Sequence, residues 1–274
     1  MGVESVARLS VSYRVMDEDG KTVVSALSPE LVVPDAEAPA AYTPEGEPLY
    51  YQDGLRVYSL GFDGAAGQAT LLLEKTVGSW RGLRLDAVFD GVQEGRSLEL
   101  PMESGQRRVC VFSADRPVSG VDIYCSPIYL NSLSAPIRLT LGSPGPLTDS
   151  ASAGEPIWTA GDCELRFMGV SDGYFCDSDA LLFECVNRSG ETYWLYPVGD
   201  SVSLDGVPMA VSTTGAQCYP GSRRTVAVAV DDLAAPDLSE YEKLDLALEL
   251  YTLGGAHLKS EYKSEPLSVA LPGE

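Results

Sequence analysis

The sequence predicts an all-β protein, and two observations carry that prediction. Apolar and polar residues alternate with a period of two along many short segments, as in strands with one buried and one solvated face. Turn pairs built from Asp and Gly separate these segments at intervals of about 8–12 residues, the spacing typical of a β-sandwich. The clearest case is residues 244–251, where four leucines alternate with Asp, Ala, Glu and Tyr.

The same alternation recurs along most of the chain. We expect further strands at residues 9–15, 55–60, 69–77, 83–89, 107–113, 121–125, 164–170, 180–186, 193–198 and 224–230. Turns are expected between them at Asp63-Gly64, Asp90-Gly91, Asp172-Gly173 and Asp205-Gly206. Only residues 236–243 have a helical pattern, of about two turns at most.

The chain also repeats itself, which divides it into domains. Three segments of a first unit recur in the same order in a second: Glu47–Tyr50 as Glu155–Trp158, Ala69–Glu74 as Asp179–Glu184, and Gly105–Arg108 as Gly221–Arg224. These units span residues 46–142 and 154–274. Residues 34–45 and 143–153 are predicted linkers, because both are rich in Pro, Gly, Ala or Ser.

Residues 1–33 resemble the end of the repeated unit: a strand, a turn, a second strand and then Pro29-Glu30-Leu31. We therefore expect them to be the terminal hairpin of a preceding repeat. A two-stranded hairpin is marginal in water by itself. It should pack on the first unit or complete a sheet edge, in this chain or in another one.

Composition excludes several classes of partner. The 274 residues include 19 Lys and Arg against 40 Asp and Glu, for a net charge of −21. Such a chain cannot neutralise nucleic-acid phosphates or dock on an anionic membrane. Most of the excess lies in residues 154–274, with 7 basic and 20 acidic residues. It serves solubility or offers a surface for a basic partner or cations.

Little in the sequence points to catalysis, metal or cofactor chemistry. His257 is the single histidine, which removes most His-based mechanisms and metal sites. No phosphate-binding, dinucleotide or nucleophile-elbow motif occurs. Asp231-Asp232 would point to opposite faces of a strand, so it is expected to be a polar strand end and not a carboxylate pair. We predict no cofactor, no metal and no catalytic residue.

Four of the six cysteines fall on the apolar faces of predicted strands. Cys110, Cys125, Cys163 and Cys185 are expected to be small buried hydrophobic residues. Cys176 and Cys218 lie in Gly/Asp- or Pro-rich segments and are expected to be exposed. A disulfide among the six stays open, since connectivity cannot be deduced from sequence.

Aromatic residues are the better functional lead. There are 14 Tyr and 3 Trp against 6 Phe, a bias toward rings with a polar end. Tyr193, Trp194 and Tyr196 cluster on one predicted strand, with Trp194 and Tyr196 on one face and Tyr193 on the other. They are candidates for a sugar-stacking platform. The alternative is that one face fills the core while the other covers the sheet.

The order of features in the second unit resembles a known family. The strand Ala180–Val186 ends in Asn187-Arg188-Ser189-Gly190, a hairpin follows at Val202–Gly206, and Pro220–Arg224 opens the next strand. This order is similar to the immunoglobulin-like repeats of secreted proteins and lipoproteins of Gram-positive anaerobic bacteria. Together with the internal repeat, it favours two tandem immunoglobulin-like β-sandwich domains plus the N-terminal β-hairpin. The resemblance itself implies an extracellular or envelope location and an accessory or binding role.

These points favour a non-enzymatic spacer or protein-interaction module of a bacterial surface or secreted protein. The first alternative is a carbohydrate-binding module that uses surface Tyr and Trp. A more distant alternative is a hydrolase with its site between the two units. The chain has no apolar stretch of about 20 residues for a membrane span. It also has no signal peptide, so a cytoplasmic location stays open.

Overall fold

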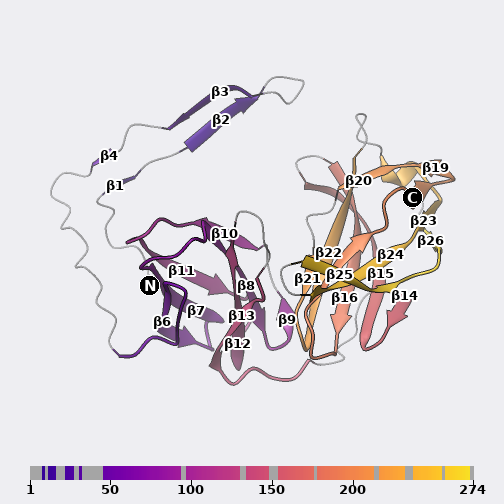
Figure 1. Ribbon diagram of the computed structural model, residues 1–274. Helices are drawn as coiled ribbons and strands as arrows, with labels where there is room; N and C mark the ends of the chain where they lie inside the picture. The colour runs from indigo at the N-terminus through magenta and orange to yellow at the C-terminus, as the bar shows by residue number, and fades with distance from the viewer. Residues whose placement is uncertain are drawn as a thin grey trace. The chain divides into compact units, whose positions relative to one another are not determined.

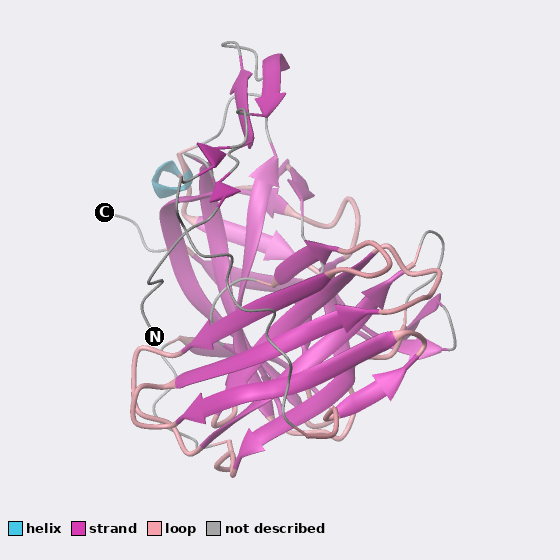
Figure 2. Ribbon diagram, turned by 90° about the vertical axis from the view of Figure 1, so that its left-hand side faces the viewer, coloured by secondary structure: helices cyan, strands magenta, loops and turns pink. Residues whose placement is uncertain are grey.

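The computed structural model describes residues 8–9, 12–16, 22–27, 31–32, 46–93, 97–129, 134–147, 154–175, 178–212, 216–231, 237–254 and 257–271. It is an all-β protein built from antiparallel sheets, as predicted (Figures 1 and 2). Residues Met1–Glu47 and Pro48–Glu274 form separate compact units, and each is described by itself. The predicted linkers lie largely outside the described residues.

The first sandwich packs two four-stranded sheets over one hydrophobic core. One sheet has the order β11-β7-β6-β5: Arg107–Ser113, Gln68–Lys75, Leu55–Asp63 and Tyr50–Gln52. The other has the order β10-β8-β12-β13: Leu98–Pro101, Gly82–Phe89, Gly120–Ile128 and Ile137–Gly142. Alternate residues of these strands point inward, so period-two patterning becomes a buried layer.

The second sandwich repeats that strand order. One sheet runs β22-β16-β15-β14: Ser222–Asp231, Ser178–Asn187, Cys163–Phe175 and Glu155–Ala160, with β20 (Ala210–Ser212) beside β22. The facing sheet runs β21-β17-β24-β25: Ala216–Cys218, Tyr193–Pro197, Leu248–Gly254 and His257–Lys263. A short third sheet runs β19-β18-β23-β26: Val207–Pro208, Ser203–Leu204, Lys243–Leu246 and Leu267–Ala270.

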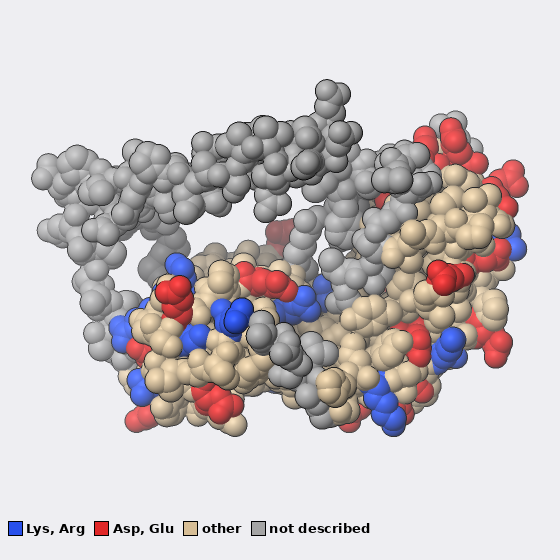
Figure 3. All heavy atoms as spheres, turned by 45° about the horizontal axis from the view of Figure 1, so that its top comes forward, with Lys and Arg blue, Asp and Glu red and all other residues tan. Residues whose placement is uncertain are grey.

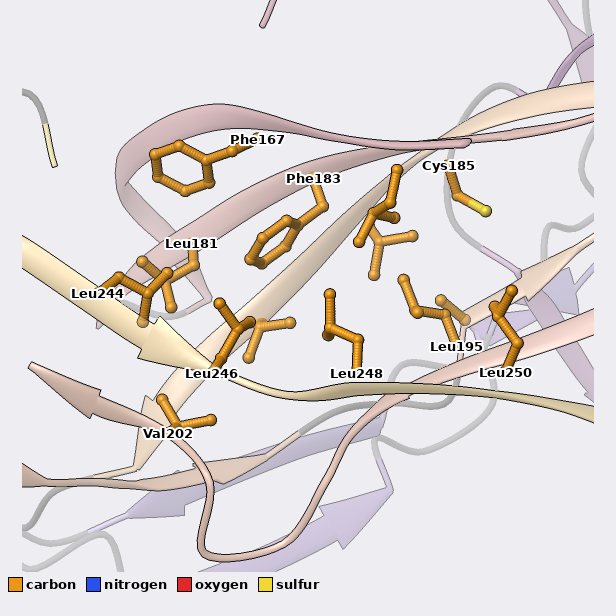
Figure 4. Close-up of a cluster of buried hydrophobic side chains, with 14 of the residues drawn as sticks. Phe167, Leu181, Phe183, Cys185, Leu195, Val202, Leu244, Leu246, Leu248 and Leu250 are labelled. Atoms are coloured by element: carbon orange, nitrogen blue, oxygen red, sulfur yellow. The ribbon is translucent and has the colours of Figure 1, made fainter. Parts of the chain in front are cut away.

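The alternating leucines at residues 244–251 supply much of the second core, as their pattern predicts. Leu244, Leu246, Leu248 and Leu250 are all buried. They face Phe167, Phe183 and other apolar side chains of β15 and β16 across the sandwich (Figure 4). Burying a leucine of this kind contributes about 1.5–3 kcal/mol relative to leaving it exposed.

Two local predictions need correction. The helical pattern at residues 236–243 yields a single 3-10 turn, Leu238–Glu240, because Asp237 caps the amide of Ser239 and Tyr241 already has an extended backbone. The predicted turn at Asp172-Gly173 lies within β15 instead, at an irregularity between Ser171 and Phe175. By contrast, Asp90-Gly91 and Asp205-Gly206 form turns with positive φ at both residues, as expected for Asp-Gly pairs.

Four strands lie within the described residues of the N-terminal unit. They are β1 (Arg8–Leu9), β2 (Ser12–Met16), β3 (Thr22–Leu27) and β4 (Leu31–Val32). β2 pairs with β3, and β1 pairs with β4, all antiparallel. The prediction of strands in this segment is therefore confirmed.

Candidate functional site: the junction between the two sandwiches

The three predicted aromatic site residues lie on β17, where the pleat separates them onto two faces. Tyr193 is 5% exposed and belongs to the core of the second sandwich. Trp194 and Tyr196 point the other way, as their alternation with Tyr193 predicts. Trp194 is nonetheless only 4% exposed, although it is not part of that core.

Trp194 and Tyr196 lie on the face of β17 that is opposite the core of the second sandwich. Tyr196 is half-buried, and the charge of Arg84 on β8 acts on its hydroxyl, opposing the rise in pKa that burial causes. Its ring meets that of Tyr251 edge-on, with centroids 5.5 Å apart and planes at 88°. These rings do not form a coplanar, exposed platform for a sugar. Tyr196 lies near the junction between the sandwiches, within reach of the charge of Arg84.

At this junction, a tyrosine ring of the first sandwich stacks on a tyrosine ring of the second. Tyr124 on β12 and Tyr219, just after β21, have ring centroids 3.8 Å apart and planes within 10°. Both rings are buried, Tyr219 completely, and with Val88 they form a hydrophobic cluster apart from the two main cores. Stacked aromatic pairs contribute about 0.5–1.5 kcal/mol beyond the area that they bury.

A buried carboxylate lies beside the stack. Asp86 on β8 is 3% exposed, and its Oδ2 accepts a 2.6 Å hydrogen bond from the hydroxyl of Tyr219. Its Oδ1 accepts bonds from Nε2 of Gln93 at 3.1 Å and from the hydroxyl of Ser97 at 2.7 Å. Burial, and then the charge of Asp86, raise the pKa of Tyr219 well above its ordinary value. The phenol therefore stays protonated and acts as the donor.

Backbone hydrogen bonds also connect the two sandwiches at this junction. β9 (Val92–Gln93) follows β8 through the Asp90-Gly91 turn and pairs in parallel with the start of β22, with Val92 opposite Arg223. The amide of Arg223 also donates to the carbonyl of Gly91 at 2.8 Å. One sheet thus runs from β13 in the first sandwich to β14 in the second.

The sequence offered no signal for Asp86 or Tyr219. Asp86 is a polar residue on the alternate face of an ordinary amphipathic strand, where solvent exposure is the default expectation. Tyr219 precedes a Pro-Gly turn and belongs to no apolar pattern. Their pairing depends on how the two sandwiches meet, which the hydropathy pattern of either one does not specify.

The cysteines are buried more completely than predicted. Cys110, Cys125, Cys163 and Cys185 are buried, as expected, and Cys176 lies outside the described residues. The expectation that Cys218 is exposed is wrong. It is fully buried, because β21 pairs with β17 opposite Tyr193 and carries its side chain into the core. The five described cysteines are free thiols, and the sulfur atoms of Cys163 and Cys185 are 3.7 Å apart.

Charged groups form no metal-binding cluster in the described part of the chain, since no group of three or more His, Cys, Asp or Glu is placed to hold an ion. Of the predicted polar pair Asp231-Asp232, Asp231 is the last residue of β22 and Asp232 is outside the described residues. On the face shown in Figure 3, acidic side chains are interspersed with basic and other residues. None of the described helical residues forms a segment long and apolar enough to cross a membrane.

No protein-family model matches this chain, and no curated protein matches its sequence.

Proposed function

We propose that this chain is a non-enzymatic immunoglobulin-like spacer and protein-interaction module of a bacterial surface or secreted protein, in which the junction holds two tandem sandwiches at a fixed angle. The matching strand orders of the sandwiches and the family resemblance of the second one support this proposal. The excess of acidic residues would keep such a module soluble and monomeric.

One observation carries the proposal: the contact between the sandwiches is buried and hydrogen-bonded. Contacts between domains of one chain usually resemble transient interfaces, so relative motion is the default. Here a stacked pair of tyrosines, a buried carboxylate with three donors and a strand pairing all restrict that motion. A spacer that presents a binding surface at a set distance needs this property.

The test is backbone 15N relaxation on the full chain. We expect the amides of both sandwiches to report one rotational correlation time. In the variant Asp86→Ala/Tyr219→Ala, which removes no residue of either main core, the two sandwiches should tumble with different times. Independent tumbling in the unaltered chain would overturn the proposal.

A glycan array separates the proposal from the carbohydrate-binding alternative. Probed with the full chain, it should give no signal that depends on the rings of β17. The matched variants are Tyr196→Ala, at the half-buried candidate ring, and Tyr51→Ala, at a ring that is 58% exposed on β5. Glycan binding that Tyr196→Ala abolishes and Tyr51→Ala preserves would favour the carbohydrate module.

A further inference from the structure

The N-terminal unit has the strand connectivity of one bent hairpin. The outer strands β1 and β4 pair with each other, and the inner strands β2 and β3 pair with each other, so each arm is divided into two strands (Figure 1). The second sandwich ends in the same arrangement. There β23 pairs with β26, and β24 pairs with β25.

The registers of this closing hairpin in the second sandwich are well defined. Its outer pairing ends with Leu246 opposite Leu267. Three residues further along the first arm, Glu249 begins the inner pairing opposite Lys263, which lies four residues before Leu267. A register shift of one residue follows within the inner pair.

The N-terminal unit reproduces each of these steps. Its outer pairing ends with Leu9 opposite Leu31. Three residues later, Ser12 begins the inner pairing opposite Leu27, four residues before Leu31. A register shift of one residue again follows within the inner pair. The shift follows four inner pairs here and two in the second sandwich, so the two hairpins share both spacings and the presence of a shift, but not its place.

In the second sandwich, the bend allows the closing hairpin to pair with strands of two different sheets. Its inner strand β24 pairs with β17, and its outer strand β23 pairs with β18. In the N-terminal unit the strands equivalent to β24 and β23 are β2 and β1. Within the described residues, each of these lies in a sheet of two strands. Open edges of this kind are templates for pairing with further strands.

We propose that residues 8–32 are the closing hairpin of a further sandwich, and that their partner is a polypeptide segment of the kind that forms β14–β22. A strand of that segment equivalent to β17 would pair with β2, and one equivalent to β18 would pair with β1, both antiparallel. This inference rests on the tandem-sandwich part of the proposed function and not on the rigid junction.

The test supplies strands of that kind to the full chain. A copy of residues 154–244 is placed directly before Arg8, as Leu244 directly precedes Asp245 in the second sandwich. Hydrogen exchange is then measured at the amides of β2 and β3. We expect protection to rise by about 100-fold or more over the ungrafted chain, toward that of β24 and β25. Unchanged exchange in β2 and β3 would overturn the proposal.

Two further variants accompany this test: one changes the register of the N-terminal hairpin, and the other moves that hairpin into the second sandwich. One alanine inserted between Ser10 and Val11 moves the side chains of β2 to the opposite face relative to β1, so it should abolish the gain in protection. In a second variant, residues 8–32 replace residues 245–268 of the second sandwich, which should still unfold cooperatively. Loss of the folded second sandwich in that exchange, together with a graft that gives no protection, would overturn the proposal.

Two other outcomes are informative. Full protection of β2 and β3 in the ungrafted chain, together with a dimer in light scattering, would assign the partner role to a second copy and contradict the proposal. The relaxation experiment measures the motion of the two sandwiches, which lie within residues 48–274. A flexible junction would therefore be recognised separately from an N-terminal hairpin that gains no protection.

Discussion

The hydroxyl of Tyr219 donates a 2.6 Å hydrogen bond to Oδ2 of Asp86, across 133 positions of sequence and between two sandwiches. Both side chains are almost completely removed from water. A buried carboxylate is costly unless donors surround it. Because one of the three donors to Asp86 comes from the other sandwich, separating the sandwiches would leave this group with one partner fewer.

Replacing Tyr219 with Phe should destabilise the protein while keeping the ring stack. The substitution removes one hydrogen bond to a buried charged group, which costs about 1–3 kcal/mol. Urea denaturation of the full chain measures the change in the free energy of unfolding.

The matched control is Tyr251→Phe. The hydroxyl of Tyr251 donates to the carboxylate of Glu249 at 2.7 Å, but both residues are partly exposed, so water can replace the lost partner. We expect a change of about 0.5 kcal/mol or less there. Equal effects of the two substitutions would argue against a buried hydrogen bond between Tyr219 and Asp86.

Tyr124→Phe, unlike Tyr219→Phe, should not lower the free energy of unfolding at neutral pH. The hydroxyl of Tyr124 is buried and makes no hydrogen bond within the described part of the chain. Removing a buried polar group without a partner is neutral or stabilising, by up to about 1 kcal/mol. A loss of more than about 1 kcal/mol in urea denaturation would show that this hydroxyl has a partner.

The same residue should make stability depend on pH in alkaline solution. Burial raises the pKa of Tyr124 from 10.0 to about 12, so the unfolded chain releases this proton before the folded one does. The free energy of unfolding should therefore fall between pH 10 and 12, by about 1.4 kcal/mol per pH unit for this group. Denaturation of the unaltered chain and of Tyr124→Phe at several pH values isolates the contribution of Tyr124 to this pH dependence. Identical slopes in the two proteins would exclude this assignment.

Gly91 is expected to be intolerant of a side chain. It has φ +78°, and a Cβ there would lie 2.9 Å from the backbone of Leu147 and 3.3 Å from the carbonyl of Gly221. Gly105, with φ +84° and open space around it, is the control for backbone strain alone. Gly105→Ala should cost about 1–2 kcal/mol, and Gly91→Ala clearly more. Equal losses in thermal or urea denaturation would mean that the close approach at Gly91 does not matter.

Thiol reactivity tests the burial of the cysteines. Cys110, Cys125, Cys163, Cys185 and Cys218 are buried, and burial raises the pKa of Cys110 to about 11. Since the thiolate is the reactive form, these five should react with a disulfide reagent only after denaturation. Peptide mapping after a short pulse of labelling gives the result by residue. Prompt labelling of Cys218 in the folded protein would contradict its place in the core.

Much of the fold followed from sequence, and the junction did not. The alternating leucines of β23 and β24 and the repeated segments specified the strands and their inward faces, because side-chain alternation is a local property of the chain. The sequence predicts an exposed Cys218 because its neighbours in sequence look like a loop, whereas its burial comes from the pairing of β21 with β17, opposite Tyr193. The alternation along β17 predicts the face of Trp194 correctly but not its burial, because Trp194 lies outside the core of its own sandwich.

A distance distribution between the sandwiches tests the central claim most directly. Spin labels at residue 59 on β6 and residue 261 on β25, both exposed positions, report it by double electron–electron resonance on the full chain. A rigid junction predicts one narrow distribution that broadens in Asp86→Ala/Tyr219→Ala. A broad distribution in the unaltered chain, unchanged by that double substitution, would contradict the account.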